Sequence, residues 1–181
     1  RSLAIAEKAY GPNHRIVGQS LNNLADLYQT QGRYTEAEPR NKRSLAIAEK
    51  VYGPDHPTVG LSLNNLAELY RHQGRYAEAM PLYERASVIL EAALRPDHVE
   101  VASALNNQAL NYFSQGRYDE AEPLYQRALE SREKALGPTH IDTGLTLNNL
   151  ADLYQLRTRY DEAKPLYERA IEIWEAALGP D

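Results

Sequence analysis

The feature that most constrains the fold of this chain is a repeat that recurs every 42 residues. The segment LNNLAxLY, in which x is Asp or Glu, begins at Leu21, Leu63 and Leu147, and the related segment LNNQALNY begins at Leu105. Self-similarity at such a period is typical of solenoid proteins. One unit of this length cannot bury its apolar face alone, so it must stack on copies of itself. The sequence therefore predicts an array of stacked units.

Each unit is predicted to begin with an amphipathic helix. Leu21, Leu24, Ala25 and Tyr28 are spaced i, i+3, i+4 and i+7, which is the pattern of one apolar helical face. Gly32 follows, and a glycine at this position is expected to end the helix.

A second helix should complete the unit. It is predicted over residues 34–51, and the glycine-proline pair at 53–54 should end it. Pro39 lies early in this helix, where a proline kinks a helix rather than preventing it. All 13 tyrosines fall in repeating slots, so we interpret tyrosine as a packing residue. Strand-like alternation is absent from the sequence, and the predicted fold class is all-α.

The predicted array covers the whole chain, residues 1–181. Residues 1–15 supply the second helix of a partial repeat, and four repeats follow at 16–57, 58–99, 100–141 and 142–181, which predicts nine helices. Because solenoids need polar caps and no capping helix follows the last repeat, we expect exposed apolar surface at the ends and a tendency to associate end to end. The chain also lacks an initial Met, so we expect it to be a piece of a longer protein.

Composition argues against several classes of function. The net charge is −5, whereas a protein that neutralises phosphates usually carries a basic domain, so we expect no nucleic-acid binding. The sequence has no cysteine and no apolar run of about 20 residues, which excludes thiolate chemistry and argues against a membrane span. No phosphate-binding loop, nucleophile elbow or zinc-protease motif occurs. We expect a cytoplasmic protein without cofactor, metal or enzymatic activity.

The repeated segments resemble the tetratricopeptide repeat. Their signature slots are occupied by Leu21, Leu24, Ala25, Tyr28, Gly32, Tyr34 and Ala37, and by equivalents in later units. The period of 42 residues and the segments YGPDHP and GRYDEAEPLYQRAL are similar to the kinesin-light-chain type. This resemblance implies a right-handed superhelix whose first helices line a concave groove, and it implies protein or peptide binding. Departures from the pattern are Arg40 and Asn41 in place of Leu-Tyr, Gln108 in place of Leu, and Thr158 in place of Gly.

The polar face of the first helix in each unit is the predicted binding surface. At about 100° per residue, Asn23 and Asp26 lie opposite the apolar stripe of the first full unit. The same face and its flanks carry amide, charged and apolar side chains in the later units. The predicted peptide-binding groove comprises Asn23, Asp26, Asn65, Glu68, Arg71, His72, Asn107, Leu110, Phe113, Asn149 and Asp152.

The paired asparagines allow two interpretations. Packed helices lie about 8–10 Å apart and an extended peptide advances about 3.3 Å per residue. One amide per unit could therefore meet a peptide backbone group about every third residue, as donor and as acceptor. The resemblance to kinesin light chain assigns this role to the second asparagine of each pair. The alternative is that the amides tie neighbouring helices together, which we favour for the first asparagine of each pair.

The variable residues of the predicted groove suggest the character of a partner. Asp26, Glu68 and Asp152 are acidic, and Leu110 and Phe113 are apolar. We therefore expect an extended protein segment with basic and apolar side chains. A different class of function is a structural module that stacks end to end or forms homo-oligomers.

One histidine recurs in the turn between units. His14, His56, His98 and His140 are each 42 residues apart and, at roughly 10 Å or more, too far from one another to share a metal ion, whose ligands all lie about 2 Å from it. We interpret them as turn residues that pack locally or cap the next helix.

Overall fold

The structure is a computed structural model that describes residues 2–179. This part of the chain contains nine helices and no strands. The helices are α1 (Ser2–Tyr10), α2 (Arg15–Thr30), α3 (Tyr34–Tyr52), α4 (Pro57–His72), α5 (Tyr76–Ala93), α6 (Val99–Ser114), α7 (Tyr118–Leu136), α8 (Ile141–Leu156) and α9 (Tyr160–Leu178). They form two compact units, unit 1 (residues 1–93, with α1–α5) and unit 2 (residues 94–181, with α6–α9).

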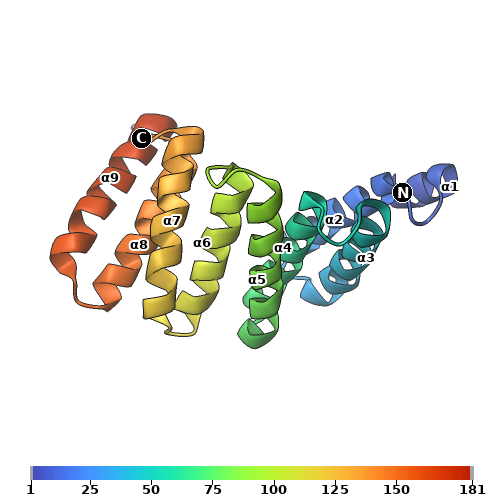
Figure 1. Cartoon of the computed structure of the whole chain (residues 1–181), viewed down its shortest axis with the longest axis horizontal. Helices are drawn as coiled ribbons and strands as arrows, with labels where there is room; N and C mark the ends of the chain where they lie inside the picture. The colour runs from blue at the N-terminus through green and yellow to red at the C-terminus, as the bar shows by residue number, and fades with distance from the viewer. Residues whose placement is uncertain (1, 180–181) are drawn as a thin grey trace. The chain divides into compact units, whose positions relative to one another are not determined.

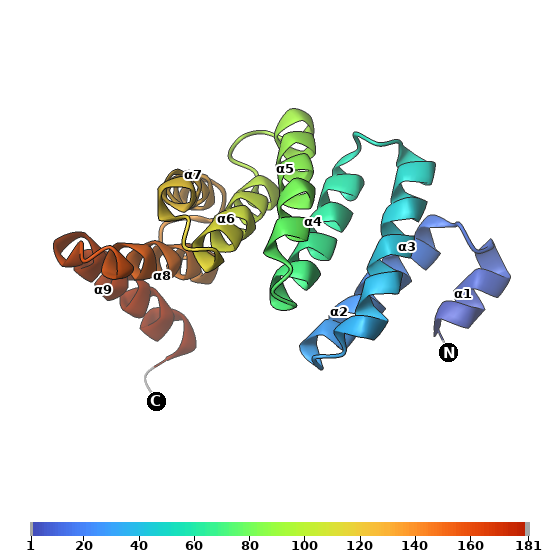
Figure 2. The same ribbon diagram turned by 90° about the horizontal axis from the view of Figure 1, so that it is seen from below.

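Both units are built from antiparallel helix pairs joined by short turns (Figure 1). In unit 1, α2 pairs with α3 and α4 pairs with α5, while α1 packs on α2 and α3 packs on α4. Unit 2 repeats this arrangement with the pairs α6–α7 and α8–α9, and α7 packs on α8 (Figure 2). The predicted all-α fold of stacked helix pairs is confirmed for the described residues.

The helix boundaries follow the local sequence signals. The second helix of the first full repeat spans Tyr34–Tyr52, against a prediction of 34–51, and Pro39 lies inside it. The recurring histidines cap the first helix of each complete repeat, namely α2, α4, α6 and α8. Capping of the next helix was one of the two interpretations of these residues. The Nδ1 atom of His14, His56, His98 and His140 accepts a hydrogen bond from the backbone N–H of Ile16, Thr58, Glu100 and Asp142, respectively.

Small residues and buried tyrosines fill the space between the helices. Ala25, Ala67 and Tyr83 are fully buried in the core of unit 1. Tyr125 is fully buried at the equivalent position of unit 2. Gly60 lets α4 approach α5 closely, because a Cβ atom there would lie 2.8 Å from Cγ of a buried leucine on α5. The packing role predicted for tyrosine is thus clearest at this pair of slots.

Candidate functional site

A polar hollow lies between α2 and α4 in unit 1. It has a volume of about 180 Å³ and contains four of the predicted groove residues: Asn23, Asp26, Asn65 and Glu68. The side chains of Asn23, Asp26 and Asn65 are exposed, and that of Glu68 is half-buried. The complete lining is Asn22, Asn23, Asp26, Gln29, Asn41, Asn65 and Glu68. The second asparagines of two successive repeats therefore meet solvent in a shared hollow.

Asn41 is a lining residue that the sequence reasoning did not include in the groove. It lies on α3 and is 3% exposed. In the next two repeats the same slot holds Tyr83 and Tyr125, which are fully buried. Asn41 thus leaves free the space that a tyrosine ring would take and adds another amide to the lining. In the sequence, Asn41 is visible as a departure from the repeat, because the later repeats have tyrosine at this position.

The lining of this hollow is acidic. Asp26 and Glu68 supply two carboxylates, while the other five lining residues are neutral amides. Two carboxylates without a basic side chain in the lining produce a negative potential, which attracts a cationic ligand and repels an anionic one.

Arg71 and His72 lie at the C-terminal end of α4 and are not among the lining residues of the hollow. Nη2 of Arg71 lies 3.2 Å from Nε2 of His72, and the His72 ring stacks on Tyr34. Nε2 of His72 lies 3.7 Å from Oε1 of Glu68. Burial, followed by the charge of Arg71, lowers the pKa of His72 against the opposite influence of Glu68. The histidine is therefore mainly neutral at pH 7.

The other five predicted groove residues belong to unit 2, and two of them, Asn149 and Asp152, hold helices together. Nδ2 of Asn149 on α8 donates a hydrogen bond of 3.2 Å to Oδ1 of Asn106 on α6. This bond between successive repeats is what the structural interpretation of the asparagines predicts. Leu110 and Phe113 are half-buried against the core of unit 2, and Asn107 is half-buried on the same helix.

Asp152 also makes contacts within unit 2. It accepts hydrogen bonds from the Tyr167 hydroxyl at 2.5 Å and from Nδ2 of Asn148 at 3.2 Å. Burial and the hydrogen bond to Asp152 raise the pKa of Tyr167 to about 12. The carboxylate that was predicted to face a ligand therefore holds α8 to α9.

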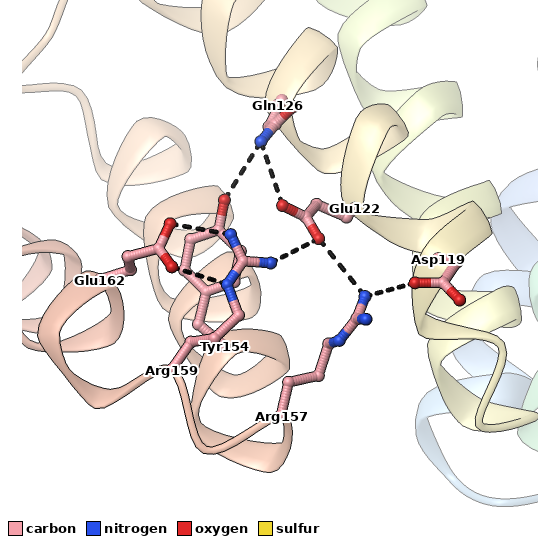
Figure 3. A network of polar contacts seen from close by, with 7 residues as sticks. All are labelled: Asp119, Glu122, Gln126, Tyr154, Arg157, Arg159 and Glu162. Carbon is pink, nitrogen blue, oxygen red and sulfur yellow. Dashed lines mark hydrogen bonds and ion pairs between the residues drawn. The ribbon is translucent and has the colours of Figure 1, made fainter.

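A charged network in unit 2 shows how the repeats are joined (Figure 3). The guanidinium of Arg159 lies 4.1 Å from the ring centroid of Tyr154 and forms ion pairs of 2.7 Å with Glu122 and with Glu162. Gln126 donates a hydrogen bond to the Tyr154 hydroxyl. The hydrogen bonds from Arg159 to Glu162 and Glu122 raise the pKa of its guanidinium, and they outweigh burial, which lowers it.

Unit 1 contains the same cluster. Arg75 lies 3.9 Å from the ring centroid of Tyr70 and pairs with Glu38 at 2.8 Å and with Glu78 at 2.7 Å. The cluster recurs at equivalent positions, and each of its carboxylates is paired to a guanidinium. We call this cluster of Arg, Glu and Tyr a clasp, because it holds neighbouring repeats together. The sequence reasoning did not find this clasp, in which the repeated GRYxEA segment supplies Arg75 and Glu78, while Tyr70 and Glu38 come from other segments.

The described residues contain no cluster of His, Cys, Asp or Glu able to hold a metal ion. Within residues 2–179, no helix is long and apolar enough to cross a membrane.

Comparison with known proteins agrees with this architecture. A family model described as tetratricopeptide repeat matches residues 1–50, 17–92 and 100–176. A crystal structure of a putative kinesin light chain from Podosopora anserina, whose own TPR-like repeats are nearly identical to one another, shares 27% identity with this chain. Its TM-score is 0.74, and the match covers 98% of this chain and 84% of that one. No curated protein matches the sequence.

Two further solved structures share the fold. BtubC (BKLC) from P. vanneervenii has 24% identity and a TM-score of 0.79, over 91% of this chain and 66% of that one. A Rap protein complexed with competence and sporulation factor has 18% identity and a TM-score of 0.79, over 88% of this chain and 43% of that one. This chain therefore spans less than two thirds of either protein.

Proposed function

Because the chain belongs to the tetratricopeptide-repeat family, with repeats of the kinesin-light-chain type, we propose that it is a scaffold that binds an extended segment of a partner protein. The binding surface is the polar hollow between α2 and α4. The observation that carries the proposal is that Asn23 and Asn65, equivalent amides of successive repeats, are both exposed in that hollow beside two carboxylates.

The chemistry of the hollow suits a peptide backbone. An amide side chain offers two donors and an acceptor, so it can pair with either backbone group without reading the sequence of the ligand. The lining residues are placed by helices rather than loops, so most of the loss of conformational entropy on binding falls on the peptide. Recognition of an extended segment in a preformed groove is an established mode of peptide binding.

The charge of the hollow suggests which segments bind. Asp26 and Glu68 favour basic side chains. Since both carboxylates are at least partly solvent-accessible, added salt should weaken the attraction by screening. A basic segment with apolar residues to cover the flanks of the helices is the expected ligand. In its structure, the Rap protein is complexed with competence and sporulation factor, so this fold is compatible with ligand binding.

The proposal is tested by selecting unstructured peptides from a display library on the full chain. We expect basic and apolar residues to be enriched. The double variant Asn23→Ala with Asn65→Ala should bind the selected peptides about tenfold more weakly or worse, because each hydrogen bond contributes about 1 kcal/mol. Asn13→Ala, in the exposed turn before α2, is the matched control and should bind normally.

Two results would contradict the proposal. Unchanged affinity in the double variant excludes the hollow as the binding surface. A double variant that unfolds at much lower denaturant concentration than the control indicates that these two amides are structural.

A second candidate function is self-assembly through apolar helix faces. Ile5 on α1 is 67% exposed and Ile171 on α9 is 49% exposed. Exposed aliphatic side chains on a helix face favour association with another copy of the chain through that face. Sedimentation velocity over a range of concentrations separates the candidates. A monomer at high concentration excludes self-assembly, whereas oligomers that dissociate on Ile5→Glu or Ile171→Glu support it.

A further inference from the structure

Unit 2 contains an arginine in a place where the other repeats have an uncharged residue. Arg132 on α7 is only 7% exposed. The corresponding residues of the other complete repeats are Ala48, Leu90 and Trp174. A buried guanidinium is costly unless it is hydrogen-bonded, so the groups around Arg132 show what kind of site accepts one.

The partners of Arg132 are neutral oxygen atoms. Its Nη1 donates to the backbone carbonyl of Asp142 at 2.7 Å and to the hydroxyl of Thr146 at 2.6 Å. Its Nη2 lies 3.5 Å from the hydroxyl of Ser103. Burial lowers the pKa of Arg132, and the charge of Asp142 opposes this. The first helices α6 and α8 therefore bind a guanidinium presented by the helix behind them.

Unit 1 has a cavity at the equivalent place. Two repeats earlier, Ala48 stands in the slot of Arg132, and Gln19, Thr58 and Ser62 stand in the slots of its three partners. All four of these residues line a cavity of about 350 Å³ bounded by α2, α3 and α4. Ligand pockets typically have volumes of roughly 300–1,000 Å³, so a side chain of arginine size fits.

The cavity needs hydrogen-bond donors. The Ser62 hydroxyl donates to the Thr58 carbonyl and the Ser44 hydroxyl donates to the Gly18 carbonyl, which leaves the lone pairs of both hydroxyl oxygens free to accept. Oδ1 of Asn22, another lining residue, is buried and has no hydrogen-bond partner. A buried acceptor without a partner is unfavourable, and a ligand that donates a hydrogen bond to it would remove that cost.

We propose that this cavity is a subsite for the guanidinium of an arginine, supplied by the segment that occupies the polar hollow. The inference rests on the proposed function, because Asn22 lines both the hollow and the cavity and so joins them. Arginine fits better than lysine for two reasons. Its planar fork reaches acceptors on three helices, and its weaker hydration lowers the cost of leaving water.

The charges around the cavity agree with this assignment. The cavity lining contains no acidic residue, so the attraction comes from neutral acceptors, as it does for the hydrogen bonds of Arg132. Arg15 lines the cavity but is exposed, so water screens its repulsion. Asp26 and Glu68 in the adjoining hollow supply a favourable field.

The first test uses arginine amide and lysine amide as probes, at matched ionic strength, with amide chemical shifts of the full chain as the readout. Arginine amide should shift the signals of Thr58 and Ser62 in a saturable manner, and lysine amide should do so at least about tenfold more weakly. Ala48→Leu fills the cavity with the residue that the next repeat uses at this slot. It should abolish the response to arginine amide while the variant stays folded.

The second test is the reciprocal experiment in unit 2. Arg132→Ala should open the equivalent cavity, and ethylguanidinium at low concentration should raise the melting temperature of this variant more than ethylammonium does. Equal responses to both probes in the two experiments, or a response of Thr58 and Ser62 that survives Ala48→Leu, would overturn the inference.

Peptide binding separates this inference from the proposed function. If selected peptides bind through Asn23 and Asn65 without a preference for arginine, and Ala48→Leu leaves their affinity unchanged, the guanidinium subsite is wrong and the scaffold function stands. If arginine amide binds in the cavity but peptide affinity is insensitive to Asn23 and Asn65, the hollow is wrong as a peptide site.

Discussion

The turn between α8 and α9 contains a threonine in a backbone conformation that suits glycine. Thr158 has φ of 59°, and the equivalent Gly116 has φ of 72°. Both turns have the hydrogen bonds of a Schellman motif: Thr158 N–H bonds to the Gln155 carbonyl at 3.0 Å, and Arg159 N–H bonds to the Tyr154 carbonyl at 2.9 Å. A β-branched residue with positive φ is strained, so replacing it should stabilise the protein.

The expected magnitude is modest. The left-handed conformation costs a residue with a Cβ atom roughly 1–2 kcal/mol. Glycine gives back about 0.4–1 kcal/mol through the greater entropy of the unfolded chain. Thr158→Gly should therefore raise the free energy of unfolding by about 1 kcal/mol, which corresponds to about 2–4 °C in melting temperature for a chain of this size. The side chain of Thr158 is exposed, so no packing should be lost.

The reciprocal variant Gly116→Thr is the matched control. A Cβ atom at Gly116 meets no atom within 4 Å, so the substitution tests backbone strain without a steric clash. We expect it to destabilise by about the same 1 kcal/mol. Urea denaturation followed by circular dichroism measures both. The reasoning is refuted if Thr158→Gly fails to stabilise, or if Gly116→Thr is neutral.

Three further predictions concern packing, capping and pH. Gly60→Ala should destabilise by about 1 kcal/mol in urea denaturation, since overpacking against Leu90 costs about 1–3 kcal/mol and exceeds the helix-propensity gain of about 1 kcal/mol. Gly18→Ala should be milder, because its Cβ meets the Ile47 side chain at 3.2 Å and the Ser44 hydroxyl at 3.8 Å, and the reverse order would contradict this. His140→Ala should cost about 0.5–2 kcal/mol through loss of the N-cap of α8, and His140→Asn should restore most of it; equal losses in both would exclude capping as the cause. Burial raises the pKa of Glu38, but hydrogen bonds from Lys42 and Arg75 outweigh it and lower the pKa below 4.5. The stability that these pairs confer is therefore full above about pH 4.5 and is lost as the pH falls through the lower folded-state value. Unfolding free energies of Glu38→Gln and the parent chain should differ at pH 7 and converge in acid, and a difference independent of pH would refute the assignment.

The second asparagines show where prediction from the sequence was strong and where it stopped. The wheel geometry placed Asn23 and Asn65 on the solvent side of their helices, and both are exposed. The same geometry placed Asn149 there, yet it is half-buried and bonded to Asn106 on the neighbouring repeat. A helical wheel describes one helix, whereas the partner of an amide depends on how closely the next helix packs. That the residues of the predicted groove bind a ligand remains a prediction.

Asn41 and Arg132 illustrate a second limit. Asn41 could be recognised in the sequence as a departure from the repeat, whereas the slot of Arg132 holds a different residue in every complete repeat. Neither pattern says whether the side chain opens a space or fills one. Asn41 takes the slot of a buried tyrosine and lines a hollow, while Arg132 takes a slot that holds Ala48, Leu90 or Trp174 in the other complete repeats and is itself buried. The outcome depends on the volume left by residues on three helices, which are far apart in sequence.

Helix type, order and length follow from short-range rules that act within about one repeat: apolar periodicity, a histidine cap, and a glycine after the last turn. Those rules, applied to each repeat, predicted nine helices, and the described residues contain nine. The division into two compact units, the Arg-Glu-Tyr clasps and the cavity beside Ala48 are properties of helices packed against each other. They depend on side-chain volumes and charge partners brought together over 30 to 40 residues, and no local pattern specifies that match.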